Sequence, residues 1–111
     1  MSGPLLVVSA HPGDFVWRAG GAIALSAQAG HTTHVVCLSF GERGESASLW
    51  KDGHDLDEVK RIRRIEAEEA AAILGAEIRF LDAGDYPLTE TPELLDTLVA
   101  IYREVQPAVV I

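Results

Sequence analysis

An apolar run meets a polar turn in the stretch Leu5-Leu6-Val7-Val8-Ser9-Ala10-His11-Pro12-Gly13-Asp14, and this junction decides the fold class. The unbroken apolar run Leu5–Val8 is typical of a strand that is buried on both faces. Residues 11–14 end that strand, because proline and glycine favour a turn. A strand covered on both sides indicates a parallel sheet flanked by helices.

Strand and helix patterns alternate along the rest of the chain. Residues 34–40 and 78–81 are further apolar strands, and residues 108–111 begin a fourth. Helical patterns lie between them, over residues 19–29, from Asp55 to Gly75 and from Pro92 to Pro107. The resulting order, β-α-β-α-β-α-β, predicts an α/β fold with right-handed crossovers and a parallel sheet.

Local signals mark the ends of these helices. Asp55 with Glu58 three residues later resembles a capping box, and Gly75 suits the end of the same helix. Thr91 is a favoured N-cap, and Pro92 after it is the favoured first residue of a helix. These signals predict where the second and third helices begin and where the second one ends.

Helical spacing also predicts which faces are buried. The helix after Asp55 is expected to turn one apolar face inward and to pair Arg64 with Glu68 on the opposite face. The inward set is Val59, Ile62, Ile65, Ala70, Ala72 and Ile73. The inward set of the helix after Thr91 is Leu94, Leu95, Leu98, Val99, Tyr102 and Val105.

The chain stops within the last predicted strand, at Val109-Val110-Ile111. Four parallel strands that end there would leave an apolar sheet edge uncovered. We therefore expect residues 1–111 to be the N-terminal part of a single catalytic domain that continues beyond Ile111.

Composition limits the classes of function. The chain has 111 residues, is 48% hydrophobic and carries nine Lys and Arg against seventeen Asp and Glu, for a net charge of −8. This excess of acid argues against nucleic acid as a partner, although it permits a small anionic substrate. A lone cysteine, Cys37, excludes an internal disulfide and is interpreted as a core residue. With no signal peptide and no membrane-length apolar stretch, we expect a soluble cytoplasmic protein.

Polar chemistry is concentrated in three predicted loops. In open parallel sheets, ligands bind beyond the carboxyl ends of the strands. The loops in that position are residues 11–14, 41–46 and 82–86, which carry one histidine, two glutamates and three aspartates. The second of them opens a long polar loop, residues 41–54. Trp17 and Trp50 lie near these loops and are interpreted as pocket wall or core.

His11 and Asp14 are the first candidates for metal ligands. Imidazole and carboxylate groups are standard ligands of a catalytic zinc, and the tight Pro12-Gly13 turn would bring both onto one ion. Spacing alone favours the alternative, in which Asp14 forms an Asx turn beside an ordinary loop histidine. If the two share a metal, their coordinating atoms should lie within about 4 Å of each other.

Several motifs together resemble one known family. Ala10-His11-Pro12-Gly13-Asp14 resembles the Ala-His-Pro-Asp-Asp signature of the PIG-L/LmbE-type zinc N-deacetylase superfamily. Residues 41–45 resemble its Gly-Glu-x-Gly-Glu loop. Arg63-x-x-Glu66 with Ala70 and Leu74-Gly75 resembles its Arg-x-x-Glu…Ala…Leu-Gly helix. The resemblance covers the whole chain and implies a Rossmann-like three-layer αβα fold, of which this is the N-terminal half.

The resemblance implies a metal site. It assigns His11 and Asp14 as ligands of Zn²⁺ or another divalent metal, with a third ligand, a histidine, beyond Ile111. One residue departs from the signature, since Gly13 stands where the deacetylases have their general base. Glycine cannot accept a proton, so deacetylation by that route is in doubt. Residues 14–25 and 37–46 resemble the 4-oxalomesaconate hydratase branch of the superfamily.

Four further residues are candidates for the chemistry. Glu45 is a candidate general base, with a solvated loop carboxylate as the alternative, and Glu42 is a weaker candidate whose side chain would otherwise cap the loop. Arg63 would bind a substrate carboxylate or else pair with Glu66. Asp85 resembles a substrate-lining position of the family, although a turn-forming aspartate is the alternative.

These expectations lead to one preferred function and two rivals. The preferred function is a metal-dependent hydro-lyase that adds water to an unsaturated polycarboxylic acid, as in bacterial gallate and protocatechuate degradation. The rivals are a zinc-dependent N-deacetylase of an N-acetyl amino sugar or related amide, and a non-catalytic metal- or ligand-binding domain. The residues leave the oligomeric state open, a homo-oligomer included. They also lead us to expect that residues 1–111 alone are inactive.

Overall fold

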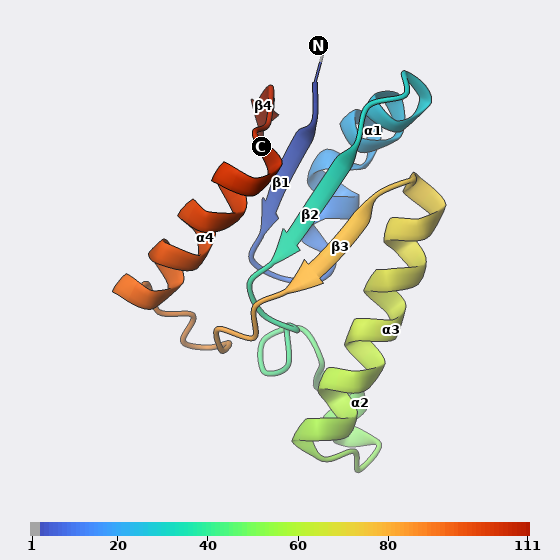
Figure 1. Ribbon diagram of the computed structural model, residues 1–111. Coiled ribbons are helices and arrows are strands. Elements are labelled where there is room, and N and C mark those ends of the chain that lie inside the picture. The colour runs from blue at the N-terminus through green and yellow to red at the C-terminus, as the bar shows by residue number, and fades with distance from the viewer. Residues whose placement is uncertain (1–2) are drawn as a thin grey trace.

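The computed structural model describes residues 3–111, which form a sheet between two layers of helices (Figure 1). The strands are β1 (Leu5–Ser9), β2 (Thr33–Cys37), β3 (Glu77–Phe80) and β4 (Val109–Val110). The helices are α1 (Asp14–Gln28), α2 (Ala47–Lys51), α3 (Leu56–Leu74) and α4 (Pro92–Val105). The strands are parallel in the order β3-β2-β1-β4. This confirms the predicted α/β fold.

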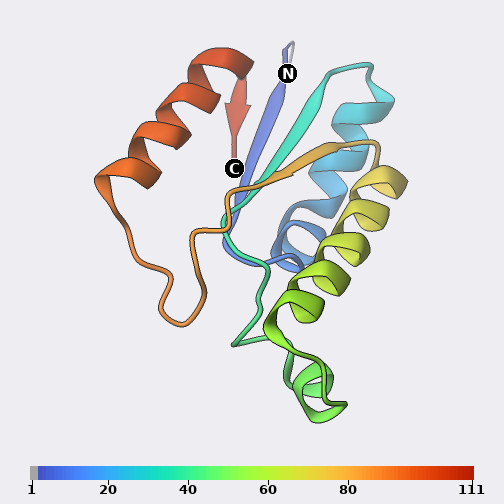
Figure 2. The same cartoon turned by 60° about the horizontal axis from the view of Figure 1, so that its bottom comes forward.

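Both faces of the sheet are covered, because α1 and α3 lie on one side and α4 on the other (Figure 2). Alternate residues of β1 point to opposite layers. Leu5 and Val7 join the core under α1 and α3, whereas Leu6 packs with Ile101 of α4. The apolar run that opens the chain is therefore buried on both faces, as expected.

Helix α1 begins at Asp14, five residues before the predicted start at Ala19. The backbone N–H groups of Val16 and Trp17 already donate to the Gly13 carbonyl. Buried Phe15, which the predicted helix does not include, belongs to the same inward stripe as Ala19 and Ile23. Asp14 therefore lies in the first turn of a helix, where a carboxylate is favoured by the helix dipole.

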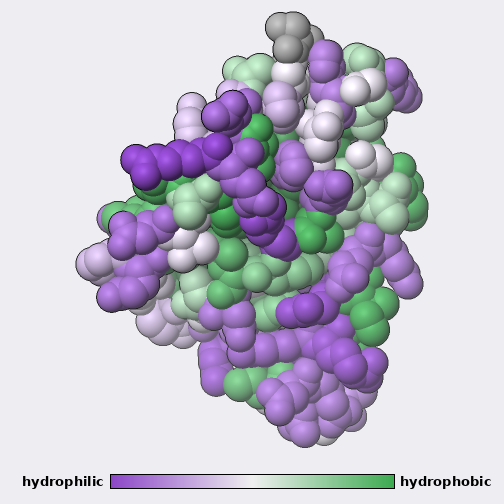
Figure 3. All heavy atoms as spheres, in the orientation of Figure 1, coloured by the Kyte–Doolittle hydropathy of each residue, from purple (hydrophilic) through white to green (hydrophobic). Residues whose placement is uncertain are grey.

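The cap predictions for the later helices are confirmed. The Asp55 carboxylate accepts a hydrogen bond from the Glu58 N–H at 2.9 Å, and the Thr91 hydroxyl accepts one from the Leu94 N–H at 3.1 Å. Residues 41–54 are not one loop, however, because they contain the short helix α2. Figure 3 shows hydrophilic side chains covering the end of the molecule formed by α2 and the start of α3.

The predicted inward face of α3 is partly wrong. Val59 is buried, but Ile73 is 86% exposed, and the other buried residues of the helix are Ala67 and Ala71. The small alanines let α3 approach α1 closely, so the buried stripe follows them rather than the isoleucines. Arg64 does not form the predicted pair with Glu68, since its guanidinium lies over the Phe40 and Phe80 rings, 5.2 and 5.3 Å from their centroids.

The apolar face of α4 is narrower than predicted. Leu94, Leu98, Ile101 and Val105 turn toward the sheet, and Ile101 is the buried residue of the helix. Three other members of the predicted set, Leu95, Val99 and Tyr102, are exposed. Within residues 3–111, no helix is long and apolar enough to cross a membrane.

Gly75 should be required at the junction of α3 and β3. Its φ is +85°, and an added Cβ would lie 2.8 Å from the Ala27 Cβ of α1. We expect Gly75→Ala to lower the free energy of unfolding by about 1–2 kcal/mol through backbone strain. The steric clash should cost about 1–3 kcal/mol more. Urea unfolding of the variant measures the sum of these two losses of stability.

Gly30→Ala is the matched control for this substitution. Gly30 follows α1 with a φ of +83°, but an added Cβ there would meet no atom within 4 Å. It should therefore show the strain without the clash. Equal losses of stability in the two variants would contradict the close packing of α3 on α1.

Candidate metal centre

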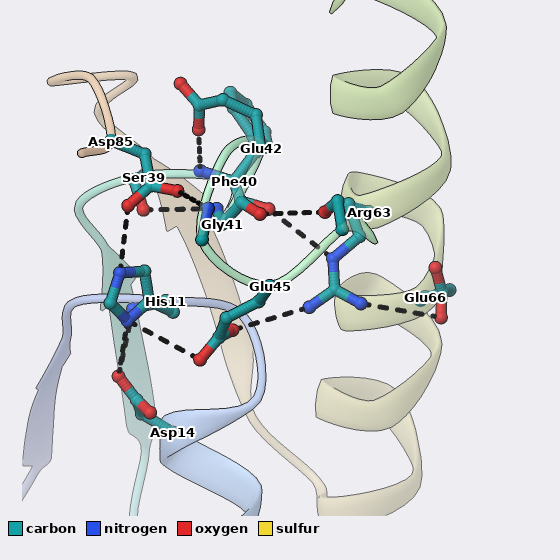
Figure 4. A network of polar contacts seen from close by, with 12 residues as sticks. His11, Asp14, Ser39, Phe40, Gly41, Glu42, Glu45, Arg63, Glu66 and Asp85 are labelled. Carbon is teal, nitrogen blue, oxygen red and sulfur yellow. Dashed lines mark hydrogen bonds and ion pairs between the residues drawn. The ribbon is translucent and has the colours of Figure 1, made fainter. Parts of the chain in front are cut away.

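Three loops meet beyond the carboxyl ends of β1, β2 and β3, as the topology predicts (Figure 4). They bring together four side chains: His11 from the first loop, Asp14 at the start of α1, Glu45 from the second loop and Asp85 from the third. Arg63 of α3 approaches from the side of Glu45. Four of the six histidine, glutamate and aspartate residues of the three loops therefore lie together.

His11 and Asp14 face each other across the Pro12-Gly13 turn. The distance from His11 Nδ1 to Asp14 Oδ2 is 3.4 Å, within the 4 Å expected for a shared metal. The same carboxylate oxygen accepts the His11 backbone N–H at 3.1 Å. The turn is held from behind, because the Ser9 hydroxyl donates to the His11 carbonyl at 2.6 Å. Asp14 thus makes a turn-stabilising bond and approaches the imidazole as well.

Glu45 completes the cluster. Its Oε1 lies 3.7 Å from His11 Nδ1, and its Oε2 lies 3.7 Å from an Arg63 guanidinium nitrogen. The loop reaches this position through Gly41, whose φ is +61°. A Cβ at Gly41 would lie 3.1 Å from Glu45 Oε2 and 3.2 Å from Pro12 Cδ. Only glycine therefore fits this turn without displacing Glu45.

Asp85 is buried, with 6% of its surface exposed. Its Oδ1 lies 3.0 Å from His11 Nε2, and its Oδ2 accepts the backbone N–H groups of Arg43 and Gly44 at 2.9 and 2.8 Å. Burial alone would raise the pKa of Asp85. The hydrogen bonds from Gly44, Arg43 and His11 outweigh burial, so the pKa of the carboxyl lies below its ordinary value.

Glu42 takes the loop-capping alternative. Its Oε1 accepts the Phe40 N–H at 3.0 Å, and the residue is buried. Its carbonyl accepts the Trp50 indole N–H at 2.6 Å, so Trp50 holds the loop in place. This carboxylate is engaged in folding the loop and does not belong to the His11–Asp14–Glu45 cluster, and a catalytic role for Glu42 stays a prediction.

Arg63 lies between the cluster and Glu66. Its guanidinium lies 3.9 Å from the Glu66 carboxylate, as in the surface-pair alternative, and 3.7 Å from Glu45 on the site side. Its Nε donates to the Phe40 carbonyl at 3.5 Å. These long contacts hold the side chain loosely beside the cluster.

The donor set fits a divalent cation. One atom from each of His11, Asp14 and Glu45 lies within 4.8 Å of the other two. Two ligand atoms that share a tetrahedral zinc with bonds of about 2.0–2.2 Å lie about 3.3–3.6 Å apart, close to the 3.4 Å between His11 and Asp14. A divalent cation placed between His11 Nδ1 and the two carboxylates would be attracted by all three groups.

A hollow of about 200 Å³ adjoins the cluster, lined by Pro12, Gly13, Val16, Trp17, Arg63 and Glu66 among others. Trp17 is 87% exposed, so the interpretation as core is wrong and this indole forms part of a pocket wall. Gly13 has ordinary helical φ and ψ of −84° and −23°. A Cβ there would meet only Trp17, at 3.7 Å. The backbone does not therefore require glycine at this position.

Cys37 lies below the site in β2 and is fully buried, which confirms the interpretation as a core residue. Burial raises the pKa of its thiol to about 12. The thiol is thus kept protonated, and its burial separates it from the cluster. His34 and His54 pair with Glu77 and Glu58 on the surface, away from the site.

Comparison with known proteins reveals extensive similarity to hydratases. The chain is 59% identical over 107 residues to the 4-oxalmesaconate hydratase of Pseudomonas putida, covering 96% of this chain and 42% of that protein. The crystal structure of a 4-carboxy-2-hydroxymuconate hydratase from Pseudomonas putida matches with a TM-score of 0.94 and 58% identity. That match covers 96% of this chain and 45% of the other.

Deacetylases are similar at a greater distance. The chain is 33% identical, over an alignment 129 residues long, to the 1D-myo-inositol 2-acetamido-2-deoxy-alpha-D-glucopyranoside deacetylase of Rhodococcus erythropolis. The alignment covers 96% of this chain and 44% of that protein. The chain thus spans less than half the length of each of these relatives. Residues 6–111 match the family described as PIG-L: GlcNAc-PI de-N-acetylase. The chain therefore belongs to the PIG-L family.

Proposed function

We propose that this chain is the N-terminal part of a single metal-dependent catalytic domain that adds water to a carbon–carbon double bond of an unsaturated polycarboxylic acid. The observation that carries the proposal is the 59% identity to a hydratase along 96% of the chain, against 33% for a deacetylase. Gly13 supports it, because the position that would hold the deacetylase base has no side chain.

His11 and Asp14 would hold the metal, zinc in the first instance, together with a histidine beyond Ile111. When bound, a divalent cation supplies Lewis acidity and lowers the pKa of a coordinated water. His11 Nδ1 and Asp14 Oδ2 support this role because they converge at 3.4 Å. Asp14 also carries the negative charge that a cation requires.

Glu45 would move the proton. Hydration adds hydroxide to one alkene carbon and a proton to the other, so a base must take a proton from water and return it to carbon. Glu45 is suited to this because one of its oxygens faces His11 while the other lies near Arg63, at 3.7 Å each.

Arg63 would orient the substrate. A polycarboxylate approaching Asp14 and Glu45 meets two negative charges, and the site needs a cation to receive it. Arg63 lines the hollow beside Gly13, and its contacts with Glu45 and Glu66 are both long. It can therefore exchange a weak pairing for a bidentate one with a substrate carboxylate. A small anionic substrate, no nucleic-acid partner and a cytoplasmic location complete the proposal.

N-deacetylation is the second candidate function. Membership of the PIG-L family and the identity to a sugar deacetylase favour it. The full-length protein should be assayed on an unsaturated tricarboxylic acid, with loss or gain of the conjugated absorbance as the readout, and on an N-acetyl amino sugar, with released acetate as the readout. We expect turnover of the first substrate. Efficient release of acetate with no turnover of the polycarboxylate would replace the hydratase proposal by the deacetylase.

Gly13→Asp should weaken hydration mainly through a higher KM. The added carboxylate would point toward the hollow beside Trp17, where the backbone leaves room for it. A further negative charge near an anionic substrate should cost about 1–3 kcal/mol of binding, or about 5- to 150-fold in KM. Steady-state kinetics on the polycarboxylate measures this effect. Slight acetate release from the N-acetyl sugar is a second expected result.

Gly13→Asn is the control, because it adds a side chain of the same size without the charge. Its KM should stay close to that of the wild type. If the asparagine variant loses as much as the aspartate variant, size rather than charge is responsible, and the electrostatic argument fails.

A further inference from the structure

Asp85 is poorly placed to bind a substrate, although its sequence position resembles a substrate-lining one. The residue is only 6% exposed, and both carboxylate oxygens already have partners in the protein. To reach a substrate, Asp85 would have to give up bonds of 2.8–3.0 Å inside the loop cluster. Its partners point to another role.

We propose that Asp85 is a positioning residue that keeps the proton of the His11 ring on Nε2 and thereby leaves Nδ1 free to bind metal. An ionised carboxylate only accepts hydrogen bonds, so the 3.0 Å contact with Oδ1 requires a proton on Nε2. In the neutral ring, Nδ1 is then the nitrogen with the free lone pair. That nitrogen faces Asp14 and Glu45.

Backbone donors hold the Asp85 carboxylate beside His11. Oδ2 is bound by two consecutive backbone N–H groups, those of Arg43 and Gly44, so the carboxylate has a fixed orientation. The loops after β2 and β3 therefore cooperate to orient a histidine in the loop after β1, 74 residues away from Asp85 in the sequence.

This inference rests on the proposed metal site, because a fixed tautomer matters only if His11 binds a cation. Histidine ligands commonly donate their second ring N–H to a carboxylate, and loss of that partner lowers metal affinity by roughly 10- to 100-fold. Such a loss differs from the effect of removing a substrate contact, which changes KM and leaves the metal bound.

Asp85→Asn in the full-length protein separates the two roles. Two backbone donors hold the side-chain oxygen on the Arg43 and Gly44 side. The asparagine should keep its oxygen there and direct its NH₂ group at His11 Nε2. Nε2 must then accept, the ring proton moves to Nδ1, and the metal-binding nitrogen is blocked. The variant keeps both backbone hydrogen bonds and should remain folded.

Two measurements test the proposal. Zn²⁺ titration should give a 10- to 100-fold weaker affinity for Asp85→Asn than for the wild type. Selective ¹⁵N-histidine NMR of the metal-free protein, at a pH where the ring is neutral, should show the proton on Nε2 in the wild type and on Nδ1 in the variant. Asp82→Asn is the control: Asp82 belongs to the same loop but pairs with Lys60 at the surface, 3.0 Å away, and its replacement should change neither result.

The outcomes separate this proposal from the proposed function. A wild-type ring with its proton on Nδ1 overturns the positioning role, whether or not the variant folds. Unchanged Zn²⁺ affinity with a raised KM in Asp85→Asn also overturns it and returns Asp85 to substrate binding. If the wild type itself binds no divalent metal, the proposed function fails, while the NMR result still decides which ring nitrogen of His11 carries the proton.

Discussion

Replacing His11 by alanine in the full-length protein is expected to abolish both metal binding and hydration. His11 is the one imidazole in the cluster that could hold a metal among residues 3–111, and the two other members contribute only carboxylate oxygens. Because a direct ligand is lost, the fall in Zn²⁺ affinity should exceed the roughly 10- to 100-fold typical of an outer partner. Metal analysis of the dialysed protein and turnover of an unsaturated tricarboxylic acid measure the two effects.

His54→Ala is the matched control for this experiment. His54 also contacts a carboxylate, with its Nδ1 3.0 Å from Glu58 Oε2, but it precedes α3 and stands apart from the cluster. It should retain metal and turnover. If His11→Ala kept full metal content and activity, the metal centre would have to be sought elsewhere, and the proposed function would lose its basis.

Glu45→Gln should lower kcat by about 10²- to 10⁴-fold while the protein keeps its metal. Glutamine preserves the size of the side chain and its reach toward His11, but it cannot accept a proton. The other members of the cluster, His11 and Asp14, remain to hold the ion. Turnover and metal content should be measured on the same sample, since only their comparison identifies the role.

The geometry makes this a demanding test, because Glu45 Oε1 approaches His11 Nδ1 almost as closely as Asp14 does, at 3.7 against 3.4 Å. Loss of metal in Glu45→Gln would show that Glu45 is a ligand rather than the proton carrier, and unchanged turnover would remove it from the mechanism. Glu66→Gln is the control. Glu66 also pairs with Arg63, at 3.9 Å, but it is exposed on α3 and should leave kcat unchanged.

The surroundings of the site explain why the approach of two candidates could be predicted from the sequence, whereas the contacts of the others could not. His11 and Asp14 are three residues apart across one turn, so their approach follows from local geometry. Glu42 and Glu45 are also three residues apart. Even so, Glu42 caps the loop, whereas Glu45 faces the histidine. The difference depends on which backbone N–H groups the folded loop presents, and a spacing pattern does not contain that information.

The sequence by itself determined the α/β order, the two buried strands β1 and β2, and the helix caps at Asp55 and Thr91. Each of these depends on interactions among residues within about four positions, or on a repeat of apolar residues along one element. The tertiary structure alone decided that α3 packs on Ala67 and Ala71 and exposes Ile73. It also decided that Asp85 turns inward to His11. These arrangements join segments distant in sequence, where packing density and the available hydrogen-bond donors, rather than local preference, select the conformation.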